Sequence, residues 1–251
     1  MNINELYIYF LECEDISTDS RSVKKNSLFF ALKGDNFDGN KYALEALNKG
    51  AKYAIIDDSN LKNPNFIKVQ NVLNSLQKLS AFHRIQLSKT KIIALTGSNG
   101  KTTCKELMNS VFNYQNNSVS TVGNLNNHIG VPLSLLKIKK HSEFAIIEMG
   151  ANHLNEISFL TNLIKPDLGY ITNFGKAHLE GFGDLNGVIK GKTELYDWLI
   201  KNNKQILINA DDEIQNKFKN SNSITFSQTR KSDYIFKQLQ TAEHISISYN
   251  N

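Results

Sequence analysis

The sequence predicts an α/β protein in which a small amino-terminal α/β domain precedes a P-loop domain built on a doubly wound, mostly parallel sheet. Downstream of residue 90, short apolar runs alternate with segments of helical spacing, which is typical of parallel strands covered by helices. The segment Thr96–Thr103 (TGSNGKTT) lies between the apolar run Lys91–Leu95 and a helical pattern over Lys105–Phe112. A glycine-rich turn between a buried strand and a helix is the usual form of a phosphate-binding loop.

The amino-terminal part reads as a compact α/β domain. We expect strands at the apolar run Leu28–Leu32 and at two later runs, with one helix between these runs and another after them. The later strands are expected at Tyr53–Ile56 and Phe66–Val69, and the helices at Tyr42–Lys49 and Val72–Leu87. The boundary falls near residues 86–90, which gives a domain over 1–88 and a second over 89–251.

The second domain supplies further strand-like runs. After Lys91–Leu95 they are Val119–Val122, Glu143–Glu148, Leu168–Thr172 and Gln205–Ile208. The last thirty residues alternate as short antiparallel strands do, at Ile224–Ser227, Asp233–Leu239 and His244–Tyr249.

Composition and charge exclude several classes of function. The longest apolar run is far shorter than the ~18 residues of a membrane span. The net charge of +5 comes from scattered lysines, with arginine only at positions 21, 84 and 230, so we interpret it as solvated surface and not as a nucleic-acid site. Cys13 and Cys104 have no metal-type or disulfide-type spacing, which fits a reducing cytoplasm.

The glycine-rich loop predicts nucleotide chemistry. Backbone N–H groups of Gly97, Ser98, Asn99 and Gly100 can face phosphates, Lys101 can reach the β- and γ-phosphates, and the Thr102 hydroxyl can bind Mg²⁺. Leu95 stands where the longer GxxxxGK[ST] pattern has its first glycine, which argues against an ordinary P-loop kinase or GTPase. The alternative to phosphate binding is that the glycines only form a turn before a helix.

Two further strand ends carry polar residues at the edge where open α/β sheets bind ligands. Glu148 follows the run Phe144–Ile147 and is a candidate Mg²⁺ ligand beside Thr102, or else a strand-end carboxylate facing solvent. Asn173 and His178 lie in the glycine-rich stretch after Leu168–Thr172. Asn173 is expected near the phosphates, or as the cap of a turn; a lone His is more often structural than a ligand.

Several long segments, in order, resemble the Mur ligases. They are TGSNGKTT, VGNLNNHIGVPLSLL (122–136), IIEMGANHLNEI (146–157) and ITNFGKAHLEGFGDLNGVIKGKTELY (171–196). Upstream, Asp19-Ser20-Arg21 and the stretch Leu28–Gly39 are similar to the family's UDP-sugar-peptide domain. Folylpolyglutamate synthetases share the phosphate loop but not the segments at 122–136 and 178–183.

The resemblance assigns roles to particular residues. It implies ATP bound at Gly97–Thr103 and Asn173, one Mg²⁺ on Thr102 and Glu148, and a second Mg²⁺ on His178. Lys192 matches a lysine that many members carry as a metal-binding carbamate and is favoured over the nearby Lys190 by register; the alternative is that either lysine is plain helix surface. Lys101, His178 and Lys192 are thereby the expected catalytic residues. Ser20 and Arg21 would bind the uridine diphosphate end of the substrate, and Asn126 and Asn127 its sugar-peptide side.

The implied activity is that of the family members that join D-alanyl-D-alanine to a UDP-N-acetylmuramoyl tripeptide, through an acyl phosphate and with two Mg²⁺. Family members continue into a carboxy-terminal domain that nothing after Asp212 matches, so an incomplete central domain, an absent third domain and poor ligation by this chain alone are expected. A cytoplasmic monomer is the expected state. The alternatives are a non-catalytic UDP-sugar-peptide or nucleotide binding fragment, and another ligation step of the same family.

Overall fold

The computed structural model describes residues 1–240 and 245–250, and the chain forms two compact units. Unit 1 contains Met1–Thr90 and Thr121–Ser142, and unit 2 contains Lys91–Ser120 and Glu143–Asn251. The expected division after residue 88 lies close to the first crossing between the units. Residues Thr121–Ser142, however, pack with unit 1, although the sequence assigns them to the domain 89–251.

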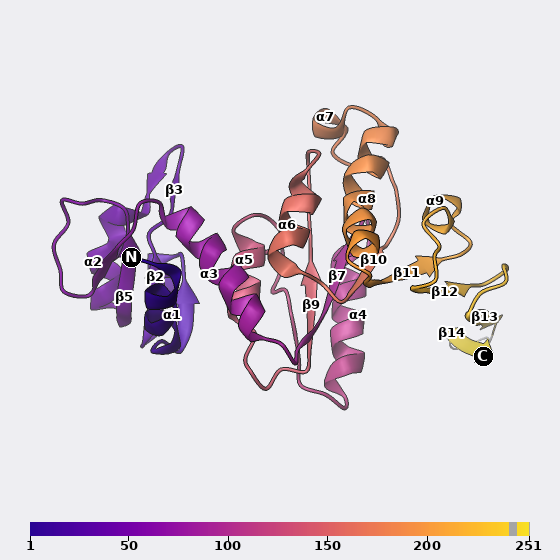
Figure 1. Ribbon diagram of the computed structural model, residues 1–251, viewed down its shortest axis with the longest axis horizontal. Coiled ribbons are helices and arrows are strands. Elements are labelled where there is room, and N and C mark those ends of the chain that lie inside the picture. Colours follow the sequence, from indigo (N-terminus) through magenta and orange to yellow (C-terminus); the bar gives the residue numbers. More distant parts are fainter. Residues whose placement is uncertain (241–244, 251) are drawn as a thin grey trace. The chain divides into compact units, whose positions relative to one another are not determined.

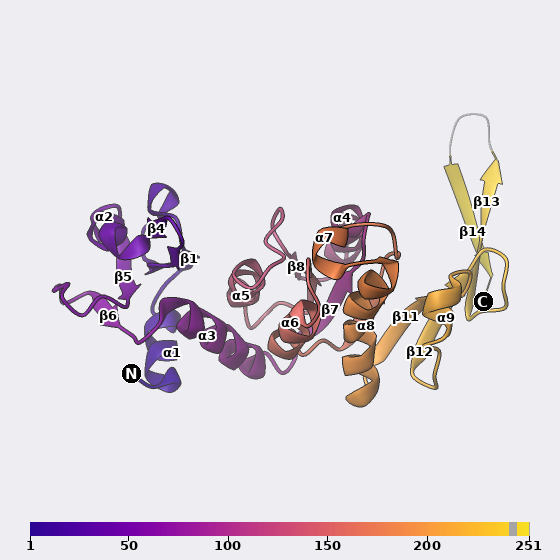
Figure 2. The same ribbon diagram turned by 90° about the horizontal axis from the view of Figure 1, so that it is seen from above.

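Unit 1 is built on a four-stranded parallel sheet of order β1-β2-β5-β6. Successive residues of β2 alternate between two cores, so that Leu28 and Phe30 pack with α1 and α3 while Phe29 packs with α2. Figure 2 shows α2 on one side of β5 and α1 with α3 on the other. Because both faces are covered, β2 reads in sequence as one apolar run. The strands are β1 (Asp15–Ser17), β2 (Ser27–Phe30), β5 (Ala51–Ile56) and β6 (Phe66–Lys68); the helices are α1 (Ile3–Leu11), α2 (Ala43–Asn48) and α3 (Val72–Gln86).

Short elements complete unit 1. A hairpin of β3 (Lys33–Gly34) and β4 (Phe37–Asp38) follows β2, and single 3₁₀ turns lie at η1 (Ser20–Ser22) and η2 (Gly39–Tyr42).

The helix α5 (Gly130–Leu136) belongs to unit 1 because its side chains complete the α3 core. Leu133 and Leu136 lie in the same cluster as Leu76 and Leu79 of α3. His83 of α3 reinforces the contact, since its Nε2 lies 2.8 Å from the Ile138 carbonyl oxygen. The segment 121–142 is therefore held by packing and by a buried hydrogen bond, which helical spacing alone does not reveal.

Unit 2 contains an eight-stranded sheet of order β14-β13-β12-β11-β10-β7-β9-β8 (Figure 1). All neighbouring strands pair in parallel except β13 and β14. The expectation of antiparallel strands over the last thirty residues is therefore right for β13 with β14 and wrong for β12, which is parallel to β11 and β13. The strands are β7 (Lys91–Thr96), β8 (Ser118–Ser120), β9 (Phe144–Glu148), β10 (Leu168–Ile171), β11 (Gln205–Asn209), β12 (Ser223–Ser227), β13 (Tyr234–Gln240) and β14 (Ile245–Asn250); His244, the first residue of the last expected strand, lies outside the described residues.

Helices cover both faces of this sheet. Ile93 packs against Met108 and Phe112 of α4, whereas a Cβ at Gly169 of β10 would meet Leu195 and Leu199 of α8. Figure 2 shows α4 on one side of the strands and α6 with α8 on the other. The expected doubly wound α/β fold is thus confirmed. The helices are α4 (Lys101–Asn113), α6 (Glu156–Ile164), α7 (Leu179–Phe182), α8 (Leu185–Lys201) and α9 (Glu213–Asn216).

The strand order creates a switch point between β7 and β10. From β7 the chain first builds β8 and β9 on one side, then β10 to β13 on the other. Ligands of open parallel sheets bind at the carboxyl ends of the strands at such a point. Within the described part of the chain, no helix combines the length and apolar character that a bilayer crossing requires.

We expect Leu136→Ala to loosen unit 1 and to leave unit 2 intact. Leu136 is fully buried in the α3 core, and removing such a side chain costs about 2–5 kcal/mol. Amide hydrogen exchange should show reduced protection in α3 and unchanged protection in β10 and β11. Leu107→Ala, at an exposed position of α4, is the control. Equal loss of protection in both units would contradict the division.

Candidate nucleotide and metal site

The loop after β7 has the backbone shape of a phosphate cradle. Gly97 has φ 146° and Gly100 has φ 75°, which are left-handed values that favour glycine. At Gly97 space also excludes a side chain, because a Cβ there would lie 1.9 Å from Thr172 Oγ1. Gly100 is the N-cap of α4, so the loop leads directly into a helix N-terminus.

The segment Thr172–Gly175 after β10, here called the strap, holds this loop in place. The Ser98 N–H donates to the Asn173 carbonyl oxygen (3.0 Å), and the Ser98 hydroxyl oxygen accepts from the Gly175 N–H (2.9 Å). Asn99 is held three times, since its N–H donates to Asn173 Oδ1 (3.1 Å) while its carbonyl oxygen accepts from Asn173 Nδ2 (3.0 Å) and Thr172 Oγ1 (2.7 Å). Asn173 therefore lies beside the loop, and its expected place near the phosphates stays a prediction.

Lys101 lies folded back onto the loop. Its Nζ donates to the carbonyl oxygens of Gly97 (2.8 Å) and Ser98 (3.1 Å). Burial lowers the pKa of its ammonium, and the nearby Glu148 carboxylate opposes this shift. The ammonium is therefore already positioned at the mouth of the cradle.

Thr102, in the first turn of α4, pairs with Glu148, the last residue of β9. The Thr102 hydroxyl donates to Glu148 Oε2 at 3.0 Å, and Glu148 is 1% exposed. The alternative of a solvent-facing carboxylate at Glu148 is therefore wrong. A hydroxyl and a carboxylate are oxygen ligands suited to Mg²⁺, which commonly takes one or two protein carboxylates together with substrate phosphates. The two residues fit a Mg²⁺ ion held jointly with a nucleotide.

Lys192 is buried in the turn of α8 that faces α7. It is 1% exposed, whereas Lys190 is exposed, so the helical register favours Lys192 over Lys190 as the inward lysine. Its Nζ lies 5.6 Å from the centre of the Phe182 ring. Burial, and secondly the charge of Lys101, lower the pKa of Lys192 to about 8. Among the described residues its ammonium has no hydrogen bond or ion pair.

His178 is not joined to the Thr102–Glu148 pair by any hydrogen bond or ion pair among the described residues. It caps α7 with φ 53°, its side chain is half exposed, and its Nδ1 lies 3.9 Å from Glu180 Oε1. In residues 1–240 and 245–250, no three His, Cys, Asp or Glu side chains form a cluster that could hold a metal ion. The second metal site therefore stays a prediction.

The four expected substrate residues all lie in unit 1. Arg21 is 86% exposed and forms a forked pair with Asp19, whose pKa the guanidinium lowers to about 2; Ser20 occupies the same 3₁₀ turn. Asn127 Oδ1 accepts from the N–H groups of Ile129 and Gly130 and so supports the start of α5. Asn126 precedes it in the same loop.

Sequence reasoning missed the strap residues Thr172 and Gly175. In the sequence, Thr172 is recognisable only as the end of a predicted strand. No rule of spacing relates it to Asn99, which lies 73 residues earlier in the chain. The adjacency of β7 and β10, which brings them together, depends on strand order. The run of small polar residues after a buried strand was the available signal.

Comparison with known proteins extends over both units. The Mur ligase middle domain model matches residues 95–249, and the model described as Mur ligase family, catalytic domain, matches residues 12–89. The UDP-N-acetylmuramoyl-tripeptide–D-alanyl-D-alanine ligase of Haemophilus influenzae is 41% identical over 207 residues, which is 80% of this chain and 45% of that protein. The chain spans about half the length of the curated relatives it matches.

Solved structures resemble the chain over nearly its whole length. A crystal structure of MurF from Acinetobacter baumannii has a TM-score of 0.82 at 28% identity, covering 99% of this chain and 60% of that one. MurF from Thermotoga maritima in complex with ADP has a TM-score of 0.80 at 27% identity, covering 96% and 56%.

We expect the free energy of unfolding to depend on pH through the titration of Lys192. Between its folded pKa of about 8 and the ordinary 10.5, the unfolded chain binds more protons at this side chain than the folded chain does. The penalty for the buried ammonium is therefore full below pH 8 and fades as the pH rises to 10.5. Wild type should gain stability relative to Lys192→Met across this window, in denaturant titrations made in CO₂-free buffer.

Lys190→Met is the matched control, because Lys190 is an exposed lysine of the same helix. If wild type gains the same unfolding free energy relative to both variants, the effect comes from the titration of lysines in general and not from the burial of Lys192.

Proposed function

Because the chain belongs to the Mur ligase family, we propose that it supplies the substrate-binding and ATP-binding parts of an ATP-dependent ligase that joins D-alanyl-D-alanine to UDP-N-acetylmuramoyl tripeptide in peptidoglycan precursor synthesis. The observation that carries this proposal is the Thr102–Glu148 pair beside a strapped phosphate loop, in a chain with close relatives of that activity. The proposed location is the cytoplasm.

The loop residues Gly97–Thr103 would bind the ATP phosphates, with Asn173 fixing their backbone. On nucleotide binding, Lys101 Nζ would exchange the carbonyl oxygens of Gly97 and Ser98 for phosphate oxygens, which are better partners for an ammonium. Mg²⁺, held by Thr102 and Glu148 with the phosphates, would neutralise charge that grows as two anions approach.

The reaction has two balanced steps. The carboxylate oxygen of the tripeptide attacks the γ-phosphorus of ATP, the bond to the bridging oxygen breaks, and ADP leaves. The amine of D-alanyl-D-alanine then attacks the acyl carbon, phosphate leaves with the bonding electrons, and the amine loses a proton. No protein nucleophile is needed, and Lys101 serves by stabilising charge on the phosphates.

Lys192 is proposed to act as a carbamate. Its lowered pKa leaves more neutral amine near pH 7 than an ordinary lysine has. The neutral nitrogen attacks CO₂ and loses a proton, so the cation becomes an anion. This change would remove the repulsion from Lys101 and create an oxygen ligand, which we propose binds a second Mg²⁺ with His178.

The substrate side would be formed by unit 1. Arg21 can offer its guanidinium to the diphosphate, with Ser20 beside it, and the loop at Asn126 and Asn127 can contact the sugar-peptide part. The exposure of Arg21 leaves its guanidinium accessible although Asp19 holds part of it.

Phosphate release tests the ligase proposal. With Mg-ATP, UDP-N-acetylmuramoyl tripeptide and D-alanyl-D-alanine present, release should require all three and disappear in Lys101→Ala. The control is Lys176→Ala. Lys176 is an exposed lysine that directly follows the strap and makes none of the proposed contacts, whereas Lys105 is buried. Binding measurements accompany the assay.

Each outcome discriminates between functions. Binding of the UDP-tripeptide without release favours the alternative of a binding fragment. Release with a single amino acid in place of the dipeptide would indicate another ligation step of the family. Absence of both binding and release would refute the proposal.

Carbamylation has its own readout. With ¹³C-bicarbonate, a carbamate carbon signal should appear in the NMR spectrum of wild type and of Lys190→Met, and be absent from Lys192→Met. A signal that survives in Lys192→Met, or one that is absent from wild type, would contradict the assignment.

A further inference from the structure

Two side chains of α3 hold the chain on either side of α5. Gln77 Nε2 donates to the His128 carbonyl oxygen at 3.0 Å, before α5 begins. His83 Nε2 lies 2.8 Å from the Ile138 carbonyl oxygen, after α5 ends. The Gln77 bond has no part in the roles assigned above, although His128 directly follows the proposed substrate residue Asn127.

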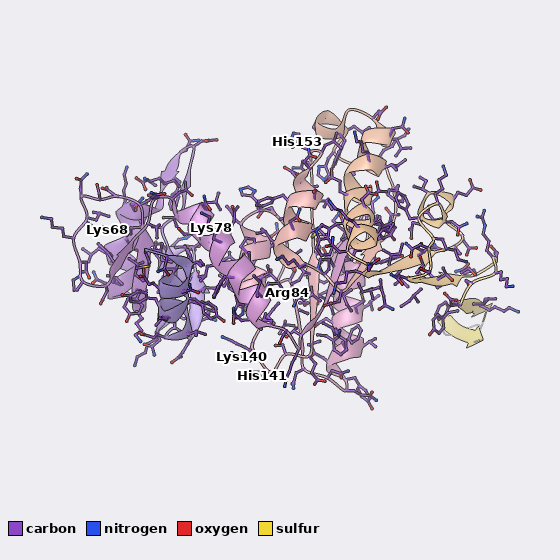
Figure 3. All side chains as sticks on the ribbon, viewed as in Figure 1. Lys68, Lys78, Arg84, Lys140, His141 and His153 are labelled. Atoms are coloured by element: carbon purple, nitrogen blue, oxygen red, sulfur yellow. The ribbon has the colours of Figure 1, made fainter. Side chains whose placement is uncertain are left out.

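Both contacts can be located on α3 in the figures. Figure 1 shows α5 beside α3, against which its leucines pack. Figure 3 labels Lys78 and Arg84, which directly follow Gln77 and His83 in the sequence. The Gln77 contact therefore lies toward the middle of α3 and the His83 contact near its carboxyl end. One helix thus supports the chain at both ends of α5.

The two ends are held unequally. After α5, His83 is 4% exposed and Ile138 is fully buried, so packing fixes this end together with the hydrogen bond. Before α5, none of residues 122–128 is buried, and Gln77 itself is only partly buried. A loop that buries little surface depends on hydrogen bonds for its position. The Gln77 bond therefore matters more for the loop than the His83 bond does.

The side chain of Asn127 is divided between two tasks. Its Oδ1 accepts from the N–H groups of Ile129 (3.1 Å) and Gly130 (2.9 Å), which closes the turn into α5. The turn is tight, because a Cβ at Gly130 would lie 2.3 Å from the Leu125 carbonyl carbon. Asn127 is exposed, and its Nδ2 has no hydrogen bond within the described part of the chain. The turn therefore fixes the direction in which Nδ2 can donate to a ligand.

We propose that Gln77 is a positioning residue for the substrate, which holds the turn at His128 so that Asn127 Nδ2 faces an oxygen acceptor of the sugar-peptide part. This inference rests on the proposed function, because that function makes Asn127 a substrate contact. Gln77 acts through the turn and does not itself touch the substrate. A turn that is held in advance loses less conformational entropy when the substrate binds.

Two substitutions separate positioning from contact. Gln77→Met keeps the length of the side chain and removes its donor, whereas Asn127→Asp keeps an acceptor for the turn and removes the Nδ2 donor. Calorimetry measures the binding of UDP-N-acetylmuramoyl tripeptide and of ADP, and amide hydrogen exchange is followed at Ile129 and Gly130. Each variant should raise the dissociation constant of the UDP-tripeptide about fivefold or more, as for the loss of one hydrogen bond, and leave ADP binding unchanged. Only Gln77→Met should speed the exchange.

Two further variants serve as controls. Gln86→Met makes the same chemical change at an exposed glutamine of the same helix, and it should alter neither UDP-tripeptide binding nor the exchange at residues 129 and 130. Gln77→Lys supplies another donor for the His128 carbonyl oxygen, so the slow exchange should be retained.

The contrary outcomes are distinct. UDP-tripeptide binding by Gln77→Met that equals that of wild type would overturn the inference and leave the proposed function standing. Weaker binding by Gln77→Met without faster exchange would make Gln77 a direct contact, and equal weakening by Gln86→Met would make the effect a general one; either result also overturns positioning. A wild-type chain that binds ADP but no UDP-tripeptide would refute the proposed substrate role of Asn127 itself.

Discussion

The adjacency of β7 and β10 is the constraint on which the nucleotide site depends. Their carboxyl ends lie side by side, so the strap can hold Ser98 and Asn99 through main-chain and side-chain hydrogen bonds. A glycine-rich loop has many conformations to lose, and fixing it in advance removes that cost from ligand binding. The close approach of Thr172 to Gly97 shows how little space the arrangement leaves.

The strap itself needs support, and a buried polar network supplies it. The fully buried Gln215 donates from Nε2 to the Ile171 carbonyl oxygen at 2.9 Å, and its Oε1 accepts from the Asn209 N–H at 3.0 Å. Tyr196 adds a bond from its hydroxyl to the Leu207 carbonyl oxygen at 2.8 Å. These bonds join the ends of β10 and β11 immediately before Thr172. Because buried polar groups are costly when unpaired, the network favours one arrangement of this sheet edge.

Sequence reasoning reached the elements whose signals are local. The phosphate loop has contiguous residues, and Glu148 ends an unmistakable apolar run, so both were found by position alone. The inward direction of Lys192 followed only when α8 was seen to bury it against Phe182. The contacts of the strap and the parallel pairing of β12 could not be predicted from the sequence, because strand order and strand direction are set by contacts between distant residues. The four substrate residues and the second metal ligand are assigned by family resemblance.

The placement of residues 121–142 changes how the two sets of functional residues are held. By sequence, Asn126 and Asn127 stand between β8 and β9 of unit 2, yet α5 anchors their loop to α3 of unit 1. The proposed substrate residues therefore all belong to unit 1, and the proposed nucleotide residues all belong to unit 2. An apolar helix inserted into the middle of the second sheet's sequence assigns Asn126 and Asn127 to the first unit, since Leu133 and Leu136 are buried in its core. A substitution in α5 would then disturb Asn126 and Asn127, and would spare Lys101 and Glu148.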